Sequence, residues 1–288
     1  MVGDELAGKR WKLRNRIAEL GSAVVAFSGG VDSTLLLAVC VDVLGPERVL
    51  AVTVESAIHP SIERGHAAGL AVQLHARHRV VGFDALSDPD LVANSLQRCY
   101  FCKRALMKML RAIADEEGLA YIVHGANVDD RGDFRPGTRA AEEAGAVAPL
   151  QEAGFTKEDI RTLSREMGLP TWDVPSMACL ASRFPYGTLL TREGLERVDK
   201  GEDLLREMLS LGQLRVRDHM PVARIEVPEA ELGRLVEPGV RAAIVAGFKE
   251  LGYTYVTLDL AGFRSGSLNE VLGSLADERR AGEQHVRG

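Results

Sequence analysis

The segment at residues 28–34, with the sequence SGGVDST, constrains the fold of this chain more than any other part. An apolar run at residues 23–27 precedes it, and residues 35–43, which are apolar and free of glycine and proline, follow it. This order predicts a buried strand, a tight glycine turn and a helix that begins near Asp32. Adjacent glycines let a ligand approach the backbone closely, and the free N–H groups at the start of a helix favour a phosphate or pyrophosphate.

Short β-branched runs alternate with helical stretches through the first half of the chain. We expect strands over residues 23–27, 49–54, 79–83 and 121–124, and helices over 61–73, 103–117 and 138–143. This pattern predicts an α/β fold with a doubly wound parallel sheet that binds ligands beyond the carboxyl ends of its strands. Thr156 and Asp159 form a capping-box pattern, which predicts a further helix that stops at Gly168.

The segment at residues 170–188 is rich in proline and has few regular elements, so we expect a long functional loop and a domain boundary there. We expect one domain at residues 1–175 and a smaller α+β domain for substrate binding and oligomerisation at 176–288. The second domain is expected to contain helices over 192–209 and 240–251 and strands over 213–217, 222–227 and 253–260, in a partly antiparallel sheet. The charged tail from Asp277 is expected to be frayed or disordered.

The composition and charge of the chain argue against a membrane-spanning, secreted or nucleic-acid-binding protein. No apolar run approaches the roughly 20 residues that span a bilayer, and the charged, helix-like start is not a signal peptide, so we expect a cytoplasmic protein. The net charge of −6 argues against a broad nucleic-acid surface. His75, Arg77, His78 and Arg79 are either a local basic patch or a solvated strand end.

Three of the four cysteines are candidates for chemistry. Cys99 and Cys102 form a C-x-x-C pair, expected just before a helix, and two thiolates at that spacing can bind one metal centre. A redox pair and two ordinary half-buried thiols are the alternatives. Cys179 lies in the irregular loop beside Ser182 and Arg183. Cys40 lies on the apolar helix, which favours core packing.

Strand alternation brings charged side chains together in the second half. Arg215 and Arg217 are expected on one face of a strand, and paired guanidinium groups suit a phosphate. A solvated strand face with surface ion pairs is the alternative. Arg224 and Glu226 share a face of the next strand, either as substrate contacts or as an ion pair. Together with the turn after the last strand, the candidate substrate-binding residues are Arg183, Arg215, Arg217, Arg224, Glu226, Arg264, Ser265 and Ser267.

The glycine turn is not a Walker A loop, because the lysine of that motif is missing. It resembles the PP-loop of the ATP pyrophosphatase superfamily, whose members cleave ATP between its α and β phosphates and adenylylate a substrate. A turn that merely caps a helix, with Asp32 or Ser33 as N-cap, is the alternative. Asp32 is a candidate Mg²⁺ ligand. The candidate nucleotide contacts are Ser28, Gly29, Gly30, Val31, Asp32, Ser33, Thr34, Gly125, Asn127 and Asp130.

The motifs SGGVDST, RCYFCK, HGANVDD, PSMACLASRFPYG, LRVRDH, ARIEV and LDLAGFRSGSLNE together resemble the LarE family of ATP-dependent sacrificial sulfur transferases, from about residue 8 to 275. The resemblance implies that ATP activates a carboxylate of pyridinium-3,5-biscarboxylic acid mononucleotide as an acyl-adenylate and that sulfur delivery then leaves a thiocarboxylate and AMP. The product feeds the nickel-pincer nucleotide cofactor of lactate racemase. A homo-oligomer is also implied. The candidate catalytic residues are Cys179, Asp32 and Glu202. Glu202 is the weakest of them, because it could instead be an ordinary exposed acid on a helix.

Members of this family differ in their sulfur source. Some sacrifice the sulfur of the loop cysteine, here Cys179, and keep dehydroalanine, whereas others carry three cysteines that resemble ligands of a 4Fe–4S cluster. Because Cys99, Cys102 and Cys179 are all present, we expect the cluster type. Another PP-loop ligase, a tRNA thiolase and a non-catalytic nucleotide- or cluster-binding sensor are the alternatives. The expected partners are the mononucleotide and a sulfur or cluster donor, with neither nucleic acid nor membrane.

Overall fold

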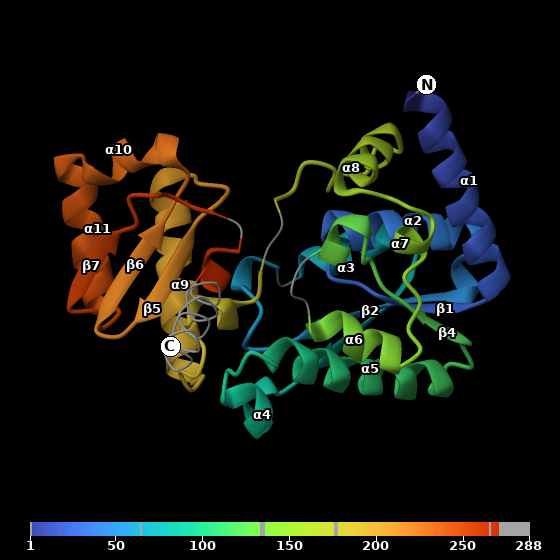
Figure 1. Cartoon of the computed structure of the whole chain (residues 1–288), viewed down its shortest axis with the longest axis horizontal. Coiled ribbons are helices and arrows are strands. Elements are labelled where there is room, and N and C mark those ends of the chain that lie inside the picture. Colours follow the sequence, from blue (N-terminus) through green and yellow to red (C-terminus); the bar gives the residue numbers. More distant parts are fainter. Residues whose placement is uncertain (1, 64, 133–135, 176–177, 265, 271–288) are drawn as a thin grey trace, which may run out of the picture. The chain divides into compact units, whose positions relative to one another are not determined.

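The computed structural model describes residues 2–63, 65–132, 136–175, 178–264 and 266–270 (Figure 1). The chain forms two compact units, Met1–Ala178 and Cys179–Gly288. Within the described ranges, none of the helices is both long enough and apolar enough to cross a membrane. The tail expected to fray from Asp277 onward lies outside the described residues.

The first unit is built on a four-stranded parallel sheet in the order β3-β2-β1-β4. Its strands are β1 (Ala23–Ala26), β2 (Val49–Glu55), β3 (Arg77–Gly82) and β4 (Tyr121–Val123). The chain proceeds outward from β1 to β3 and then returns to the opposite side of β1, so the strand order reverses between β1 and β4. In open α/β sheets, ligands bind at such a reversal, beyond the carboxyl ends of the strands. The SGGVDST turn follows β1 at this point.

Helices cover both faces of this sheet, which confirms the doubly wound fold. Alternate residues of β1 point to opposite faces. Val24 belongs to the core on the side of α5, and Val25 belongs to the core on the side of α1 and α2. Figure 1 shows α5 and α6 on one face and α1, α2 and α8 on the other. The helices are α1 (Val2–Leu20), α2 (Val31–Leu44), α3 (His66–Gln73), α4 (Pro89–Val92), α5 (Arg98–Glu116), α6 (Pro136–Glu143), α7 (Pro149–Glu152) and α8 (Lys157–Glu166).

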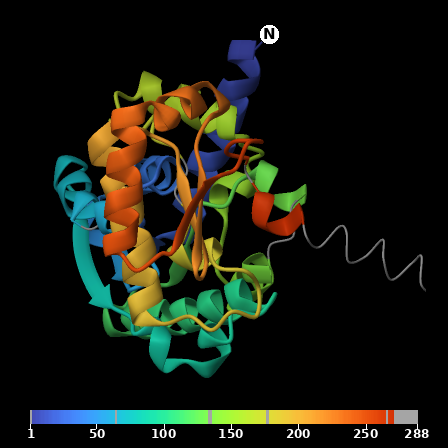
Figure 2. The same cartoon turned by 90° about the vertical axis from the view of Figure 1, so that its left-hand side faces the viewer.

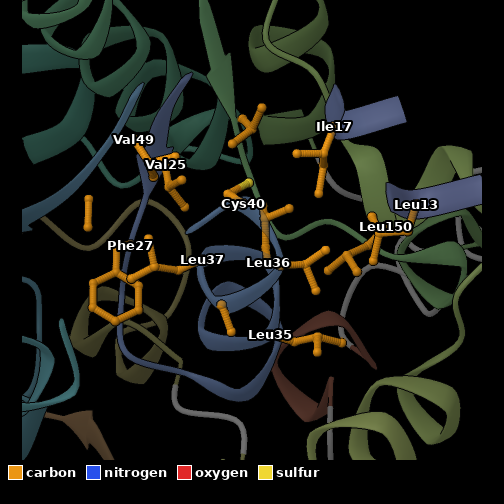
Figure 3. Packing of buried hydrophobic residues seen from close by; sticks show 14 of the residues in the cluster. Leu13, Ile17, Val25, Phe27, Leu35, Leu36, Leu37, Cys40, Val49 and Leu150 are labelled. Carbon is orange, nitrogen blue, oxygen red and sulfur yellow. The ribbon is translucent and has the colours of Figure 1, made fainter. Parts of the chain in front are cut away.

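Helix α2 is almost entirely enclosed, because the sheet covers one side of it and α1 and α8 cover the other. A helix that is apolar around its whole circumference fits such a position. Leu35, Leu36 and Leu37 point in different directions into one continuous core with residues of β1 and α1 (Figure 3). Cys40 is part of this core, where burial raises the pKa of its thiol to about 12. The expectation that Cys40 is a packing residue is therefore confirmed.

Two local predictions have different outcomes. The capping box is confirmed, since the Thr156 hydroxyl accepts from the Asp159 N–H and the Asp159 carboxylate accepts from the Thr156 N–H. The C-x-x-C pair was expected just before a helix, and this is wrong, because α5 already begins at Arg98. No glycine or proline interrupts residues 98–102, and the buried Arg98 guanidinium donates to Asn94 in the preceding turn.

The basic cluster on β3 is neutralised within the first unit. Arg77 pairs with Glu117, and Arg79 Nη1 lies 2.9 Å from Glu116 Oε2, both acids at the end of α5. His78 Nε2 lies 2.8 Å from the Thr53 hydroxyl and is partly buried. Because the Arg77 and Arg79 side chains are exposed and ion-paired, this segment fits the solvated strand of the two alternatives rather than an open basic patch.

The second unit contains a three-stranded sheet in the order β5-β6-β7. Strands β5 (Arg215–His219) and β6 (Val222–Glu226) are antiparallel, and β7 (Tyr255–Leu258) is parallel to β6, which confirms the partly antiparallel sheet. Helices α9 (Arg192–Leu209) and α11 (Pro238–Glu250) pack together beside it, and α10 (Leu232–Val236) precedes α11. Figure 2 shows α11, in orange, alongside the strands.

Register divides the residues of this second sheet between its two faces. Val216 and Ile225 are paired and buried on one face, and the Val216 N–H, at the edge of the sheet, donates to Glu202 of α9. Residues one position away point to the opposite face. That face carries Arg215, Arg217, Arg224 and Glu226.

Candidate active site

The SGGVDST turn is braced by its own hydroxyl groups. Ser28 Oγ lies 3.1 Å from Ser33 Oγ and accepts from the Gly30 N–H, and Ser33 Oγ donates to the Gly30 carbonyl. Gly29 has φ +76°, and a Cβ there would lie 3.4 Å from the Ala67 backbone, so both conformation and space favour glycine. These hydrogen bonds fix the shape of the turn and leave the first N–H groups of the following helix available to a ligand.

Those N–H groups form a cradle for an anion. The first backbone hydrogen bond of α2 runs from Thr34 N to the Gly30 carbonyl. The N–H groups of Val31, Asp32 and Ser33 have no acceptor among the described residues, as expected for the first turn of a helix. Thr34 is fully buried and its hydroxyl has no partner there either. Free amides at a helix N-terminus suit a phosphate group.

Gly125 and Asn127 come from the segment after β4 and meet the same turn. A Cβ on Gly125 would lie 3.1 Å from the backbone of Asp32 and Ser33, so a side chain there would push the two segments apart by a few tenths of an ångström. Asn127 Nδ2 lies 3.5 Å from Asp32 Oδ1, and its N–H donates to Asp130. The structure therefore brings together the predicted nucleotide residues from both segments, while their individual roles stay predictions.

Asp32 has a partner that sequence reasoning missed. The ammonium group of Lys157, the first residue of α8, donates to Asp32 Oδ2. Both side chains are partly exposed. The only nearby sequence signal is the capping box, which fixes where α8 begins but says nothing of the contact with Asp32.

Lys103 and His124 form a second group that sequence reasoning missed. Burial, and after it the charge of Lys103, lowers the pKa of His124 from 6.5 to about 3. Burial also lowers the pKa of Lys103, against the opposing influence of Cys102 and Asp130. A desolvated ammonium group beside a neutral imidazole favours the approach of an anion.

Cys99 and Cys102 lie three residues apart in the first turn of α5 and thus on one side of the helix. Cys99 is exposed and Cys102 is partly exposed, and the Arg98 guanidinium donates to Cys99 Sγ over 3.7 Å. Cys179 belongs to the second unit. Among the described residues, no three His, Cys, Asp or Glu side chains are gathered as a metal site requires, so the predicted cluster remains a prediction.

In the second unit, the Cys179 loop is fixed by a buried arginine. The Cys179 carbonyl accepts from the Ser182 hydroxyl at 2.8 Å and from Arg183 Nη1 at 3.1 Å. Arg183 is fully buried, and its Nε and Nη2 donate to the two carboxylate oxygens of Glu202 at 2.8 and 3.0 Å. Arg183 therefore holds the backbone of Cys179, whereas its predicted contact with substrate stays a prediction.

Glu202 is not the exposed helical acid that the sequence left as its alternative. Its side chain is fully buried and also accepts from Arg206 and from the Val216 N–H. Burial alone would raise its pKa, but the hydrogen bonds and charges of Arg183 and Arg206 hold the pKa below the ordinary value. Glu202 lies four positions after Val198 and three before Leu205, so helix periodicity could have indicated its burial, but not its contacts with Arg183 and the Val216 N–H.

The arginine face of the second sheet is buried rather than solvated. Arg217 donates to both carboxylate oxygens of Glu226 at 3.0 and 2.7 Å, to the Ser267 hydroxyl and to the Ser182 carbonyl. Arg224 Nη2 donates to Glu226 as well. The alternative of a solvated face is wrong for Arg217, which is 5% exposed, and an Arg224–Glu226 ion pair is present.

Arg215 and Arg264 differ in how they are held. Arg215 is 5% exposed and lies over the Phe263 ring at 5.0 Å. Burial and the neighbouring arginines lower its pKa to about 10. Arg264 forms a two-pronged ion pair with Glu270 and is partly exposed. Ser265 lies outside the described residues.

Buried arginines and carboxylates lie close together in this unit. Arg183 pairs with the buried carboxylate of Glu202, and Arg217 pairs with that of Glu226. Burial first, and then the charges of Arg183, Arg217 and Arg206, lower the pKa of Arg215, whereas the charge of Glu202 raises it. An anion close to Arg215 would stabilise its charged form.

Known proteins match this chain in its first unit alone and along nearly its whole length. Residues 10–177 match the NAD synthase family. An uncharacterised protein of Synechocystis sp. is 41% identical over 93% of this chain and 99% of its own length. The pyridinium-3,5-bisthiocarboxylic acid mononucleotide synthase of Lactiplantibacillus plantarum is 40% identical over 93% of this chain and 96% of the synthase. The chain therefore belongs to the LarE family, and its first unit is a PP-loop domain of the NAD synthase type.

Proposed function

We propose that this protein is an ATP-dependent sulfur transferase that adenylylates a carboxylate of pyridinium-3,5-biscarboxylic acid mononucleotide and converts it to a thiocarboxylate. The observation that carries the proposal is the alignment with the L. plantarum synthase along nearly the whole of both chains. A match confined to the PP-loop domain would support ATP chemistry alone. The proposed product is a precursor of the nickel-pincer nucleotide cofactor.

The first unit is proposed to bind ATP and to activate the carboxylate. The free N–H groups at the start of α2 would hold phosphate oxygens, and Asp32 would contribute to Mg²⁺ binding. One protein carboxylate is compatible with this ion, since Mg²⁺ in such sites takes its other ligands from phosphates and water. The substrate carboxylate would attack the α-phosphate, forming the acyl-adenylate and releasing pyrophosphate.

The second unit is proposed to bind the mononucleotide and to contribute to oligomerisation. Arg215 and Arg217 lie on one face of the second sheet, two positions apart, and this arrangement supports binding of a phosphate by both guanidinium groups. Arg224, Glu226 and Ser267 would keep Arg217 in position through the hydrogen bonds that join them. We also propose a homo-oligomer located in the cytoplasm.

The sulfur source is proposed to be a 4Fe–4S cluster held by Cys99, Cys102 and Cys179, with the thiol of Cys179 itself as the alternative. Three thiolates leave one iron without a protein ligand, and that iron could carry a transferable sulfide. In either case, sulfur attack on the acyl-adenylate carbonyl expels AMP. With Cys179 as donor, the product of this attack is a thioester, and loss of the Cα proton with cleavage of the Cβ–S bond would then release the thiocarboxylate and leave dehydroalanine. The bonds that Arg183 makes to the Cys179 carbonyl would hold this loop in place during transfer.

Pyrophosphate release with purified substrate tests the proposed activity. Release that depends on the pyridinium dicarboxylate mononucleotide supports it, and its absence with ATP bound would favour a nucleotide sensor. Equal turnover with tRNA would favour a thiolase instead.

Intact-mass analysis before and after one turnover identifies the sulfur source. Loss of one H₂S from the polypeptide indicates that Cys179 is sacrificed, whereas an unchanged polypeptide mass indicates the cluster. An anaerobically reconstituted sample without iron, sulfide or a broad brown absorption would exclude the cluster.

A further inference from the structure

Helix α8 holds the chain that leads from the first unit to the Cys179 loop. Arg161, in the second turn of α8, donates from Nη1 to the Trp172 carbonyl at 2.8 Å and from Nη2 to the Val174 carbonyl at 2.9 Å. Both acceptors are backbone atoms, so the guanidinium group fixes the path of the chain itself. Hydrogen bonds from a charged donor are roughly twice as strong as neutral ones. The segment after α8 is therefore anchored as far as Val174, although it forms neither a helix nor a strand.

A second anchor follows at Cys179, whose carbonyl accepts from side chains of its own loop. Between Val174 and Cys179 the chain spans five residue steps (174 to 179) and can extend at most about 18 Å. Without the Arg161 bonds, the nearest buried residue before this point would be Thr171. The free chain would then span eight steps (171 to 179) and could extend to about 29 Å. Arg161 therefore shortens the free chain in front of Cys179.

We propose that Arg161 is a positioning residue for sulfur transfer, because it limits how far Cys179 can move from the unit that activates the carboxylate. The inference rests on the proposed function. It applies to both proposed sulfur sources, since Cys179 is either the donor or a ligand of the cluster. A longer tether lowers the effective concentration of the group that it carries. Loss of Arg161 should therefore slow sulfur transfer and spare formation of the acyl-adenylate.

Single turnovers stopped by rapid quenching measure both half-reactions in the same samples, as pyrophosphate released and thiocarboxylate formed. In Arg161→Met, which keeps an unbranched apolar stem, the rate of pyrophosphate release should match that of the parent protein. The ratio of the thiocarboxylate rate to the pyrophosphate rate should fall by about 2- to 100-fold. The lower bound is the effect of the longer free chain alone, and the upper bound is the cost of misaligned reacting groups.

Two further variants separate positioning from a general structural role. Arg165→Met is the matched control, because Arg165 also lies on α8 and contacts the same segment, but over the Trp172 ring at 5.7 Å. An insertion of eight glycines between Val174 and Pro175 keeps Arg161 and both acceptors, and it should lower the ratio by about fourfold or more. The proposal is overturned if the ratio in Arg161→Met and in the insertion variant equals that of the parent, or if Arg161→Met slows both half-reactions alike.

Hydrogen exchange in the substrate-free protein measures the anchor itself. The amides of residues 172–174 should exchange at least about 10-fold faster in Arg161→Met than in Arg165→Met, the factor for losing one hydrogen bond to a charged group. Equal exchange in the two variants would also overturn the proposal. A parent protein that forms no thiocarboxylate would refute the proposed function, and the exchange measurement would still decide whether Arg161 anchors the chain.

Discussion

Acidification should destabilise the first unit through one buried imidazole. His124 directly follows β4, is 8% exposed and has a pKa lowered from 6.5 to about 3 by burial and by the charge of Lys103. Between these two values, the unfolded chain binds a proton that the native state does not. The free energy of unfolding must therefore fall as the pH drops below about 6.5, and it must continue to fall until the pH reaches about 3.

The size of the effect follows from the two pKa values. At pH 7.5 protonation of the unfolded imidazole contributes less than about 0.1 kcal/mol, whereas at pH 5.0 it lowers the free energy of the unfolded state by about 2 kcal/mol. Native His124 stays neutral at both pH values. His78 of the first unit, whose pKa burial also lowers, adds to the loss in the same direction.

Urea unfolding followed by tryptophan fluorescence measures this loss in the first unit alone, because both tryptophans, Trp11 and Trp172, lie there. The free energy of unfolding should fall by at least about 2 kcal/mol between pH 7.5 and pH 5.0. A His124→Gln variant should have lower stability at pH 7.5 and a pH dependence reduced by about 2 kcal/mol. Equal pH dependence in the two proteins would refute the argument that His124 is held neutral.

Three further substitutions test separate contacts. Gly125→Ala should lower the free energy of unfolding by about 1–3 kcal/mol and abolish ATP binding, because its Cβ would lie 3.1 Å from the α2 backbone. Gly69→Ala is the control, since a Cβ there has open space, and equal behaviour of the two variants would contradict the prediction. Glu202→Gln should lower the free energy of unfolding by about 3–5 kcal/mol, because it removes the charge that compensates the buried Arg183. The more exposed Asp203→Asn is the control, and a loss below about 1 kcal/mol in urea unfolding would be inconsistent. Thr156→Ala should cost about 1 kcal/mol in the same assay through loss of the cap, and unchanged stability would argue against the capping box.

Sequence patterns correctly predicted those elements whose conformation depends on neighbouring residues. The apolar run, glycine turn and apolar helix around residues 28–34 appear in the structure in that order, because strand burial, positive φ at Gly29 and helix periodicity each depend on adjacent residues. The start of α8 was predicted for the same reason. The early start of α5 was missed because its first turn has no side-chain cap to mark it.

Contacts between distant segments could not be predicted in this way. The Lys157–Asp32 pair depends on where α8 packs against α2, and no spacing rule connects residues 125 positions apart. Glu202 lies on the buried face of α9 between Val198 and Leu205, as helix periodicity indicates. No spacing rule shows that Arg183 and the Val216 N–H would meet it there. Strand alternation did predict the shared face of Arg215 and Arg217, but not that their neighbours would shield it from solvent.

The enclosure of Cys40 gives the protein an internal reference for counting thiols. With a pKa of about 12, this thiol is almost entirely protonated near neutral pH, and its side chain is inaccessible in the folded state. In cluster-free protein, an alkylating reagent applied to the native state should therefore label only Cys99, Cys102 and Cys179, and the denatured protein should take up one label more. If Cys179 is sacrificed, the number of labels on the native protein should fall from three to two after turnover, and the number on the denatured protein from four to three. The difference counts each sacrificed sulfur atom directly.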